Sequence, residues 1–599
     1  MDRNQLTGLL LIFLMLLVYF QFIAPKPEEL PEVKNKISAD SLAAVRAAAP
    51  ALPASDQALS DSALKAKYSV AYGEFTPALR GEEKKVVLEN KDIRVTLSTL
   101  GGKITSVLLK NYKTYDQKPL LLTEKNNSSC NLQLPTAAGN IDLSKLYFVA
   151  QNTSANAAAF RLEVAQGRFV EQTYSLGAEG FTLDYDLKVN GISLNQPARL
   201  VWQERLKNFE KDPEQSRNAA TINYLAADGF DHLSATASGE EKEDVTAVKW
   251  VAFKQKFFNM ALVSEGAPFE KGEVRTNITS AISNNYIKTA EATLFIPAAD
   301  LNAGKANFKY YFGPNQYSIL KSTEIEDFSK NVELGLPVIN WINRFVVIPV
   351  FHLLEKSISN YGIIIVILVL LIKLVLFPLS YKSYVSMAKM KVLKPELDEI
   401  KEKHGDDMAA AQQDQMKLYG QVGVSPFSGC IPLLLQMPVL LAMFNFFPNS
   451  IELRQQAFLW AGDLSVYDSI LDLPFKIPSY GSHVSLFTIL MTASTLVLTW
   501  FNNQTSTVAG PMQYMSYIMP VVFMFILNSL PAGLSFYYLV SNVVSIGQQM
   551  LIRNFVDEGA IRRKLDETRE KNANKPKSSF QQRIEQAMRN ADQAKKSQK

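Results

Sequence analysis

The chain has 599 residues, 47% of them hydrophobic, and a formal net charge of only +4. This length allows more than one domain, and so small a net charge indicates no particular class of partner. The two cysteines, Cys130 and Cys430, lie far apart, which argues against a disulfide framework or a cysteine metal site. The four histidines lack metal-ligand spacing, and the sequence has no phosphate-binding loop or zinc-protease motif. We therefore expect no enzyme activity, no cofactor and no metal.

An apolar run opens the chain and is preceded by Arg3. Because it is about 19 residues long and no small-residue cleavage site follows it, residues 1–24 are predicted to be an uncleaved transmembrane anchor. A cleaved signal peptide is the alternative. Residues 25–82 are rich in Ala, Pro, Ser and charge, so they are predicted to form a flexible linker that cannot bury enough apolar surface to order itself.

Residues 83–335 show the pattern of strands. Apolar and polar residues alternate over 181–189 and over 93–97, and Gly-containing turn signals punctuate the runs at 101–102 and 190–191. Alternation with a period of two and frequent turns predicts an antiparallel β-sandwich domain.

The rest of the chain is predicted to be largely a membrane core. Residues 336–360 carry apolar residues at helical spacing among charged ones, which favours an amphipathic helix lying in the membrane interface. A core helix of the preceding domain is the alternative. The core, 361–551, contains five further apolar segments, so with the N-terminal anchor we expect six transmembrane helices and both termini on one side: about 361–379, 428–447, 484–501, 514–530 and 532–551.

Basic residues set the expected orientation. They concentrate in 380–427 and in the tail, 552–599, whereas the loop between the second and third spans has only Arg454 and Lys476. By the positive-inside rule, both basic segments and both termini are cytoplasmic and the β-domain lies on the opposite side. The tail is predicted to contact either lipid headgroups or ribosomal RNA phosphates.

One lysine, Lys373, lies inside the apolar run 361–379, and none of the five apolar segments contains an acidic residue. Charge at membrane depth is costly and usually faces protein or water. Lys373 therefore either snorkels to the interface, pairs with a visiting anionic group, or lines a wet cavity. Polar residues on other segments favour the cavity, although they could also join helices to one another: Gln436, Asn445, Thr495, Asn528, Ser535, Ser541, Asn542, Gln548 and Gln549.

These features resemble the YidC/Oxa/Alb family of membrane-protein insertases, in its long form with a large periplasmic domain. The resemblance is dense over about 360–551 and sparser elsewhere, and it rests on several stretches: Pro426 to Pro438 with its Gly-Cys and Gln-Met-Pro, Ser386 to Met390, Gly405 to Asp407, Pro531 to Leu534, Tyr537-Tyr538, Ser541-Asn542 through Gln548-Gln549, Trp250 to Ala252, and Tyr311 to Pro314.

The resemblance implies a periplasmic supersandwich like that of galactose mutarotases and a helical core with a groove open to the cytoplasm. It implies insertion and folding of bacterial inner-membrane proteins, alone or with the Sec translocon. It also implies contacts with nascent clients, lipids and, through the tail, the ribosome, but not with DNA. Where the family has a groove arginine this chain has Lys373, which keeps the charge but not the bidentate geometry.

The resemblance assigns further residues to two places. The groove would include Gln436, Tyr537, Tyr538 and Asn542. The helical hairpin 380–427 would include Met387, Lys389, Met390 and Asp406. Its methionine and leucine stripe suits either internal packing or an adaptable client surface.

Two other functions compete with insertion. A polytopic solute transporter would be expected to have internal repeats and membrane acids, and the sequence has neither. An anchored carbohydrate sensor would need an aromatic-lined sugar site on the sandwich. Trp202 and Trp250 belong to that domain, but such residues are more often core.

Overall fold

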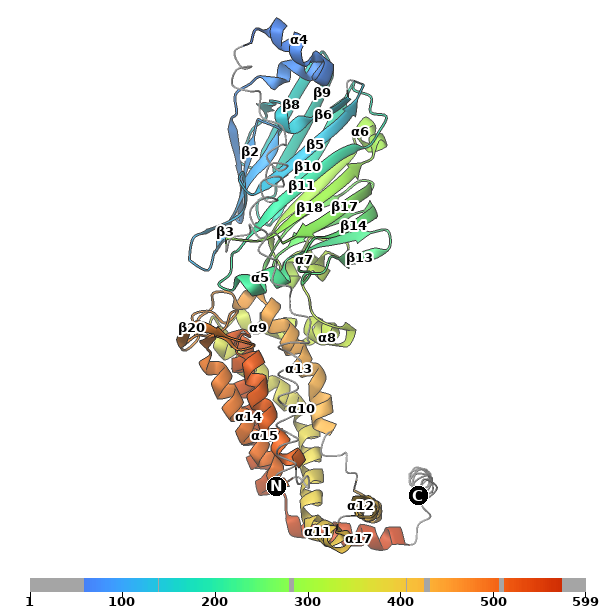
Figure 1. Ribbon diagram of the computed structural model, residues 1–599, viewed down its shortest axis with the longest axis vertical. Coiled ribbons are helices and arrows are strands. Elements are labelled where there is room, and N and C mark those ends of the chain that lie inside the picture. The colour runs from blue at the N-terminus through green and yellow to red at the C-terminus, as the bar shows by residue number, and fades with distance from the viewer. Residues whose placement is uncertain are drawn as a thin grey trace. The chain divides into compact units, whose positions relative to one another are not determined.

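The computed structural model describes residues 59–137, 139–278, 285–405, 407–424, 431–505 and 511–573 (Figure 1). The chain divides into two compact units, and the described parts of these are a β-unit up to Glu333 and a helical unit from Leu334 onward. The predicted anchor, 1–24, and Asp406 lie outside the described residues.

Antiparallel pairing builds the β-unit, as the sequence predicts. The nine-stranded sheet has the order β13 (Gly229–His232), β12 (Thr221–Ala226), β15 (Trp250–Lys254), β16 (Phe258–Ser264), β19 (Ala306–Pro314), β10 (Thr182–Asn190), β9 (Arg168–Leu176), β8 (Ala157–Ala165) and β7 (Val149–Gln151). The six-stranded sheet has the order β14 (Glu241–Val248), β17 (Phe269–Asn277), β18 (Tyr286–Ile296), β11 (Ala198–Lys207), β5 (Ser128–Thr136) and β6 (Gly139–Asp142). A third sheet contains β1 (Lys85–Glu89), β2 (Ile93–Ser98), β3 (Lys103–Lys113) and β4 (Pro119–Glu124). Short helices connect the strands: η3 (Leu143–Lys145), α5 (Pro213–Ala219), α6 (Ala298–Ala303), α7 (Tyr317–Ser322) and η4 (Phe328–Asn331).

The alternation of apolar and polar residues in the sequence determines which face of each strand is buried. Along β10, Leu183, Tyr185, Leu187 and Val189 are buried, and the residues between them are exposed. Aromatic side chains from the two larger sheets meet in the core: the ring centroids of Trp202 and Phe253 lie 4.3 Å apart, and those of Phe269 and Phe308 lie 5.5 Å apart. Such contacts join the two sheets into one hydrophobic core.

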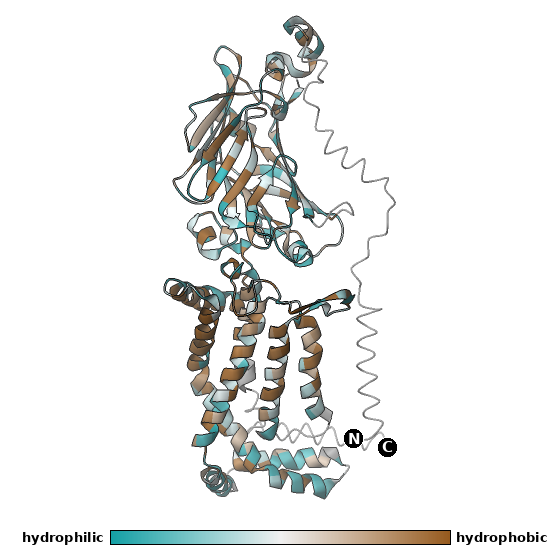
Figure 2. Cartoon of the chain, turned by 90° about the vertical axis from the view of Figure 1, so that its left-hand side faces the viewer, coloured by the Kyte–Doolittle hydropathy of each residue, from teal (hydrophilic) through white to brown (hydrophobic). Residues whose placement is uncertain are grey.

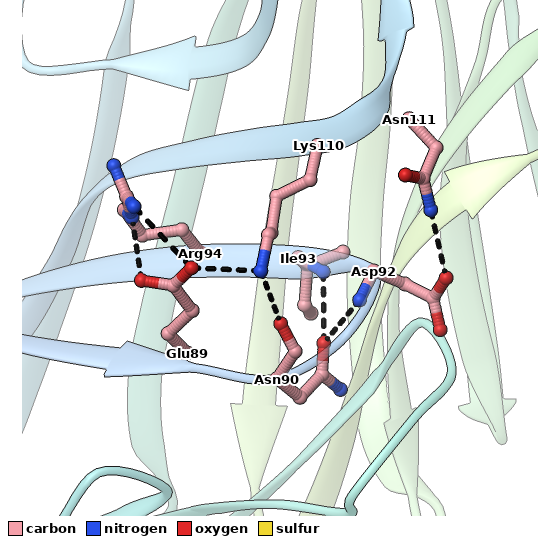
Figure 3. Close-up of polar contacts among 7 residues, drawn as sticks. All are labelled: Glu89, Asn90, Asp92, Ile93, Arg94, Lys110 and Asn111. Atoms are coloured by element: carbon pink, nitrogen blue, oxygen red, sulfur yellow. Dashed lines mark hydrogen bonds and ion pairs between the residues drawn. The ribbon is translucent and has the colours of Figure 1, made fainter.

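Polar contacts fix the turn between β1 and β2 (Figure 3). Asn90 accepts the backbone N–H groups of Asp92 and Ile93 through its side-chain oxygen, at 2.9 and 2.8 Å. Glu89 pairs with Arg94 at 2.8 Å and with Lys110 of β3 at 2.7 Å, which ties three strands together. The two cations hold the pKa of the Glu89 carboxyl down at about 2.

The flexible-linker prediction for 25–82 is wrong at its C-terminal end. Residues Asp61–Tyr72 form helix α4, and Gly73–Leu79 form a 3₁₀ turn. The Ser60 side chain caps α4 by accepting the N–H of Ala63, and Leu64, Phe75 and Leu79 are buried. A few well-spaced apolar residues and a cap suffice to order this stretch, despite its polar composition.

Helices make up most of the second unit. They are α8 (Pro337–Ile342), a π-helical turn over 343–347, α9 (Ile348–Glu355), α10 (Tyr361–Val392), α11 (Lys394–His404), α12 (Met408–Val422), α13 (Ile431–Asn449), α14 (Leu486–Thr505), α15 (Pro511–Leu527), α16 (Ala532–Phe555) and α17 (Glu558–Ala573). A short β-hairpin, β20 (Leu471–Ile477) and β21 (Gly481–Val484), precedes α14. Figure 2 shows hydrophobic residues along the long helices and mostly hydrophilic ones on α11, α12 and α17.

Within the described residues, three helical stretches are long and apolar enough to cross a membrane: Pro337–Glu355, Tyr361–Val392 and Leu486–Gln504. A shorter apolar helix spans Gln513–Leu527. The total of six spans stays a prediction. So does the interfacial placement of 336–360, where the first of the three stretches lies.

The long helix α10 continues thirteen residues beyond the predicted end of its span, from 379 to Val392. The extension belongs to the segment 380–427, which is predicted to form a helical hairpin, and no residue in it stops the helix before Pro395. Met387, Lys389 and Met390 therefore lie on α10, and the hairpin itself is α11 and α12.

Candidate functional site

Lys373 lies in α10 with only 7% of its surface exposed. Its Nζ donates a 2.7 Å hydrogen bond to Oγ of Ser545 on α16, and Ser545 in turn donates to the backbone carbonyl of Ser541. Gln548 donates to the backbone carbonyl of Lys373 at 3.3 Å. Among the described residues no carboxylate pairs with this lysine, so a hydroxyl oxygen is its polar contact.

An open depression of about 350 Å³, called the cavity below, lies beside Lys373 between α10 and α16. Gln548 and Lys373 are its polar members, and the rest of the lining is aliphatic: Ile367, Leu370, Leu371, Leu374 and Val544. Leu370 and Leu374 are also largely exposed on the outside of the helical unit. The cavity thus joins a buried cation to an apolar outer surface.

Further polar contacts link α14 and α16. Asn542 donates to Ser494 at 3.0 Å and to Thr495 at 2.8 Å. Seven residues after Asn542 on α16, Gln549 donates to Asn502 at 2.8 Å. With Ser545, these side chains give α16 a continuous polar stripe, which joins the helices and lies next to the lysine.

The hairpin packs against α17, the first part of the basic tail. Met390, Leu397, Leu418, Ile561 and Leu565 belong to one buried cluster, which supports the packing interpretation of the methionine and leucine stripe. The cluster also contains Leu393, Tyr419, Val422 and Val424. Met387 and Lys389 are half-buried and lie outside the cluster's buried residues.

Ion pairs surround this cluster. Glu396 of α11 pairs with Arg562 at 2.7 Å and also with Arg569 of α17, and Lys391 pairs with Glu558 at 2.7 Å. On the hairpin itself, Asp414 accepts bonds from Lys417 and His404, and these hold the pKa of its carboxyl at about 2. Part of the tail's basic charge is therefore already paired with the hairpin.

Two family models together match most of the chain. The one described as YidC periplasmic domain matches residues 85–349, and the one described as 60Kd inner membrane protein matches residues 353–559. The membrane protein insertase YidC of Cytophaga hutchinsonii is 49% identical over 620 aligned residues, which cover 99% of this chain and 98% of the relative. The chain belongs to the YidC family of membrane-protein insertases. Its clients are accordingly membrane proteins, and YidC relatives are named as insertases rather than as enzymes.

Solved structures resemble the chain only weakly. An active YidC insertase crystal structure with the first transmembrane domain resolved has a TM-score of 0.32 and 16% identity, covering 78% of this chain and 92% of its own. A galactose mutarotase related enzyme from Lactobacillus acidophilus has a TM-score of 0.26 and 11% identity, covering 38% of this chain and 97% of its own. Nothing further about the site follows from likenesses at this level.

The residues that the YidC resemblance assigns to the groove do not all lie in contact with Lys373 or its cavity. Asn542 lies three residues before Ser545 on the polar stripe of α16. Tyr537 is buried against Phe447, with ring centroids 5.5 Å apart, and Tyr538 packs edge-to-face on Tyr537. Gln436 is half-buried on α13 and does not line the cavity. The structure therefore brings Lys373 together with Ser545 and Gln548, and it places Asn542 nearby.

Sequence reasoning missed Ser545 and Ser494. Ser545 follows Ser541 at a spacing of four, so both lie on one face of a helix, and that periodicity was the available signal. The described residues contain no cluster of His, Cys, Asp and Glu that could hold a metal ion.

Proposed function

We propose that this insertase receives the polar flank of a client in a groove that surrounds Lys373 and is open to the cytoplasm. The observation that carries the proposal is a buried ammonium group hydrogen-bonded to a serine hydroxyl, beside an open depression of about 350 Å³. A buried cation without a carboxylate partner attracts an acidic group, because pairing offsets the desolvation of both charges. Serine and glutamine side chains around it reduce the remaining cost of bringing polar groups to this depth.

The client's apolar segment would then leave sideways into lipid. The exposed Leu370 and Leu374 beside the cavity support such a path, since they continue the cavity's aliphatic lining to the outer surface. Transfer of the segment from water to lipid would provide the driving force. No nucleotide chemistry is needed for this step.

The proposal includes six transmembrane helices, cytoplasmic termini and a periplasmic β-unit. The basic segments 380–427 and 552–599 support this orientation. We also include cooperation with the Sec translocon, assistance to client folding, and contacts of the basic tail with ribosomes and lipid headgroups. Arg553 and Arg563 of the tail have no ion pair among the described residues and so support the last of these.

Reconstitution into liposomes with a short single-span client tests the groove. Protease protection would compare the wild type with Lys373→Arg, Lys373→Ala and Lys373→Glu. We expect Arg to retain most insertion, Ala to lose roughly tenfold, and Glu to lose nearly all, because only a positive charge attracts an acidic flank.

The matched control is Lys382→Glu. This lysine lies on the same helix but is exposed, so its reversal should leave insertion almost unchanged. Equal insertion by all the Lys373 variants would contradict the groove proposal and would leave the lysine a snorkelling residue.

A further inference from the structure

The hairpin of β20 and β21, which precedes α14, carries an exposed apolar strand. Every second residue of β20 is apolar: Leu471, Leu473, Phe475 and Ile477. Such alternation is typical of a strand with one face in an apolar environment. The described part of the chain does not cover these side chains, because Leu471 is 57% exposed, Phe475 is 61% exposed, and the other two are only half-buried. Ile470, directly before the strand, is 52% exposed.

Hydrogen bonds fix the hairpin to the end of α14 where that helix begins (Figure 1). Asp468, which precedes β20, accepts the backbone N–H of Phe487 at 3.0 Å. Nε2 of His483 on β21 donates to the backbone carbonyl of Asn528, the residue after α15, at 2.9 Å. The hairpin therefore keeps one position relative to the beginning of α14 and the end of α15.

This position gives the hairpin a depth in the bilayer. Residues Leu486–Gln504 of α14 are long and apolar enough to cross a membrane. In a membrane protein such a helix begins near one surface of the bilayer. Only Ser485 separates β21 from α14, so the hairpin lies at about the level of that surface.

The apolar surface of the hairpin continues onto α15. Tyr480, in the turn between β20 and β21, packs edge-to-face on Phe525 of α15, with ring centroids 5.4 Å apart. Phe525 and its neighbour Ile526 are themselves largely exposed. Extended exposed apolar surfaces mark sites that contact protein or membrane. Continuity with an apolar helix of a membrane protein favours lipid as the partner of both.

We propose that the hairpin lies in the membrane interface, with Leu471 and Phe475 inserted among the acyl chains. Deeper immersion is unfavourable, because the outer edges of a two-stranded sheet carry backbone groups that need water or headgroups. The register of pairing also shifts between Asp472 and Ile477, which interrupts the inner ladder. Asp472 and Lys476 alternate with the apolar residues and would remain among the headgroups. The hairpin would thus hold α14 and α15 at one depth, whether or not the groove proposal is correct.

Fluorescence of the full chain in lipid nanodiscs tests this placement. Phe475→Cys would carry an environment-sensitive nitrobenzoxadiazole label, and the labelled wild type would give the background signal of Cys130 and Cys430. Lipids spin-labelled near the headgroup end of the acyl chain should quench Phe475→Cys roughly threefold more than Lys188→Cys, an exposed position of the β-unit.

The depth is read from a second lipid, spin-labelled at the methyl end of the chain. It should quench Phe475→Cys less than the first lipid does. The matched control is Val497→Cys, largely exposed and in the middle of α14, which should show the reverse order. Leu471→Cys provides an independent position in the hairpin with the same expected result, in case one substitution prevents folding.

Two results would overturn the proposal. A water-like emission at both hairpin positions, without quenching by either lipid, would place the hairpin in solvent. A blue-shifted emission that neither lipid quenches would mean that protein covers the hairpin, as in contact with a second copy of the chain.

Discussion

At the residue scale, Asn528 closes the turn between α15 and α16. Its side chain is fully buried, donates to the carbonyls of Tyr480 and His483 at 2.9 and 2.8 Å, and accepts the N–H of Ser485 at 3.0 Å. One amide therefore satisfies three backbone groups of the segment around β21. Such a residue is difficult to replace, because buried backbone groups without partners are costly.

We expect Asn528→Ala to reduce the free energy of unfolding by about 3 kcal/mol, because it leaves three backbone groups unpaired. Melting curves of the purified protein in detergent would measure the loss. Asn503→Ala, which removes a single bond to Ser516, should cost about 1 kcal/mol or less. Similar losses for the two variants would show that Asn528 has no special role.

Single residues also show where sequence reasoning succeeds and where it stops. Lys373 stands out because a charge interrupts an apolar run, and no other information is needed to notice it. Its contact with Ser545 spans 172 residues of sequence and depends on how α10 and α16 pack.

At the element scale, α17 and the hairpin form a small hydrophobic core with ion pairs at its edge. We expect the apolar contacts to dominate, because the arginines that pair with Glu396 remain partly exposed and such pairs contribute about 1 kcal/mol or less. Burial of a leucine contributes about 2 kcal/mol. Leu565→Asp should therefore increase amide hydrogen exchange across 558–573 by roughly tenfold or more.

Glu396→Gln is the matched comparison, since it keeps the shape and removes only the charge. Its effect on exchange in α17 should be several times smaller than that of Leu565→Asp. The reverse order would mean that the ion pairs hold α17 in place.

Elements differ in how far the sequence predicts them. The alternation along β10 gives both its type and its buried face, because a period of two has one interpretation in a strand. Helix α10 continues to Val392, thirteen residues beyond the predicted end of the membrane span at 379, because the lysines there mark the end of the apolar segment and not the end of a helix. The order of strands in the sheets could not be predicted, since pairing such as β5 with β11 is a long-range property.

At the scale of the whole molecule, the β-unit has a core of its own. Residues such as Val95, Trp250 and Leu294 are fully buried inside it. We expect a fragment of residues 59–333 to fold alone and to unfold cooperatively, as followed by the fluorescence of Trp202 and Trp250. Val95→Asp, which places a charge in that core, should abolish the transition. A wild-type fragment without a cooperative transition would show that the β-unit needs the rest of the chain.

The fixed position of Lys373 limits what the proposed groove can do. Its ammonium group is hydrogen-bonded to Ser545, so in the proposed groove the charge would stay in place while a client moves past it. The membrane potential delivers about 2.3 kcal/mol per 100 mV only to charges that cross the membrane. The favourable free energy of pairing between an acidic group of the client and Lys373 is lost again when that group leaves. In the proposed groove, Lys373 would therefore speed the passage of a client without setting its direction, which would come from the client itself.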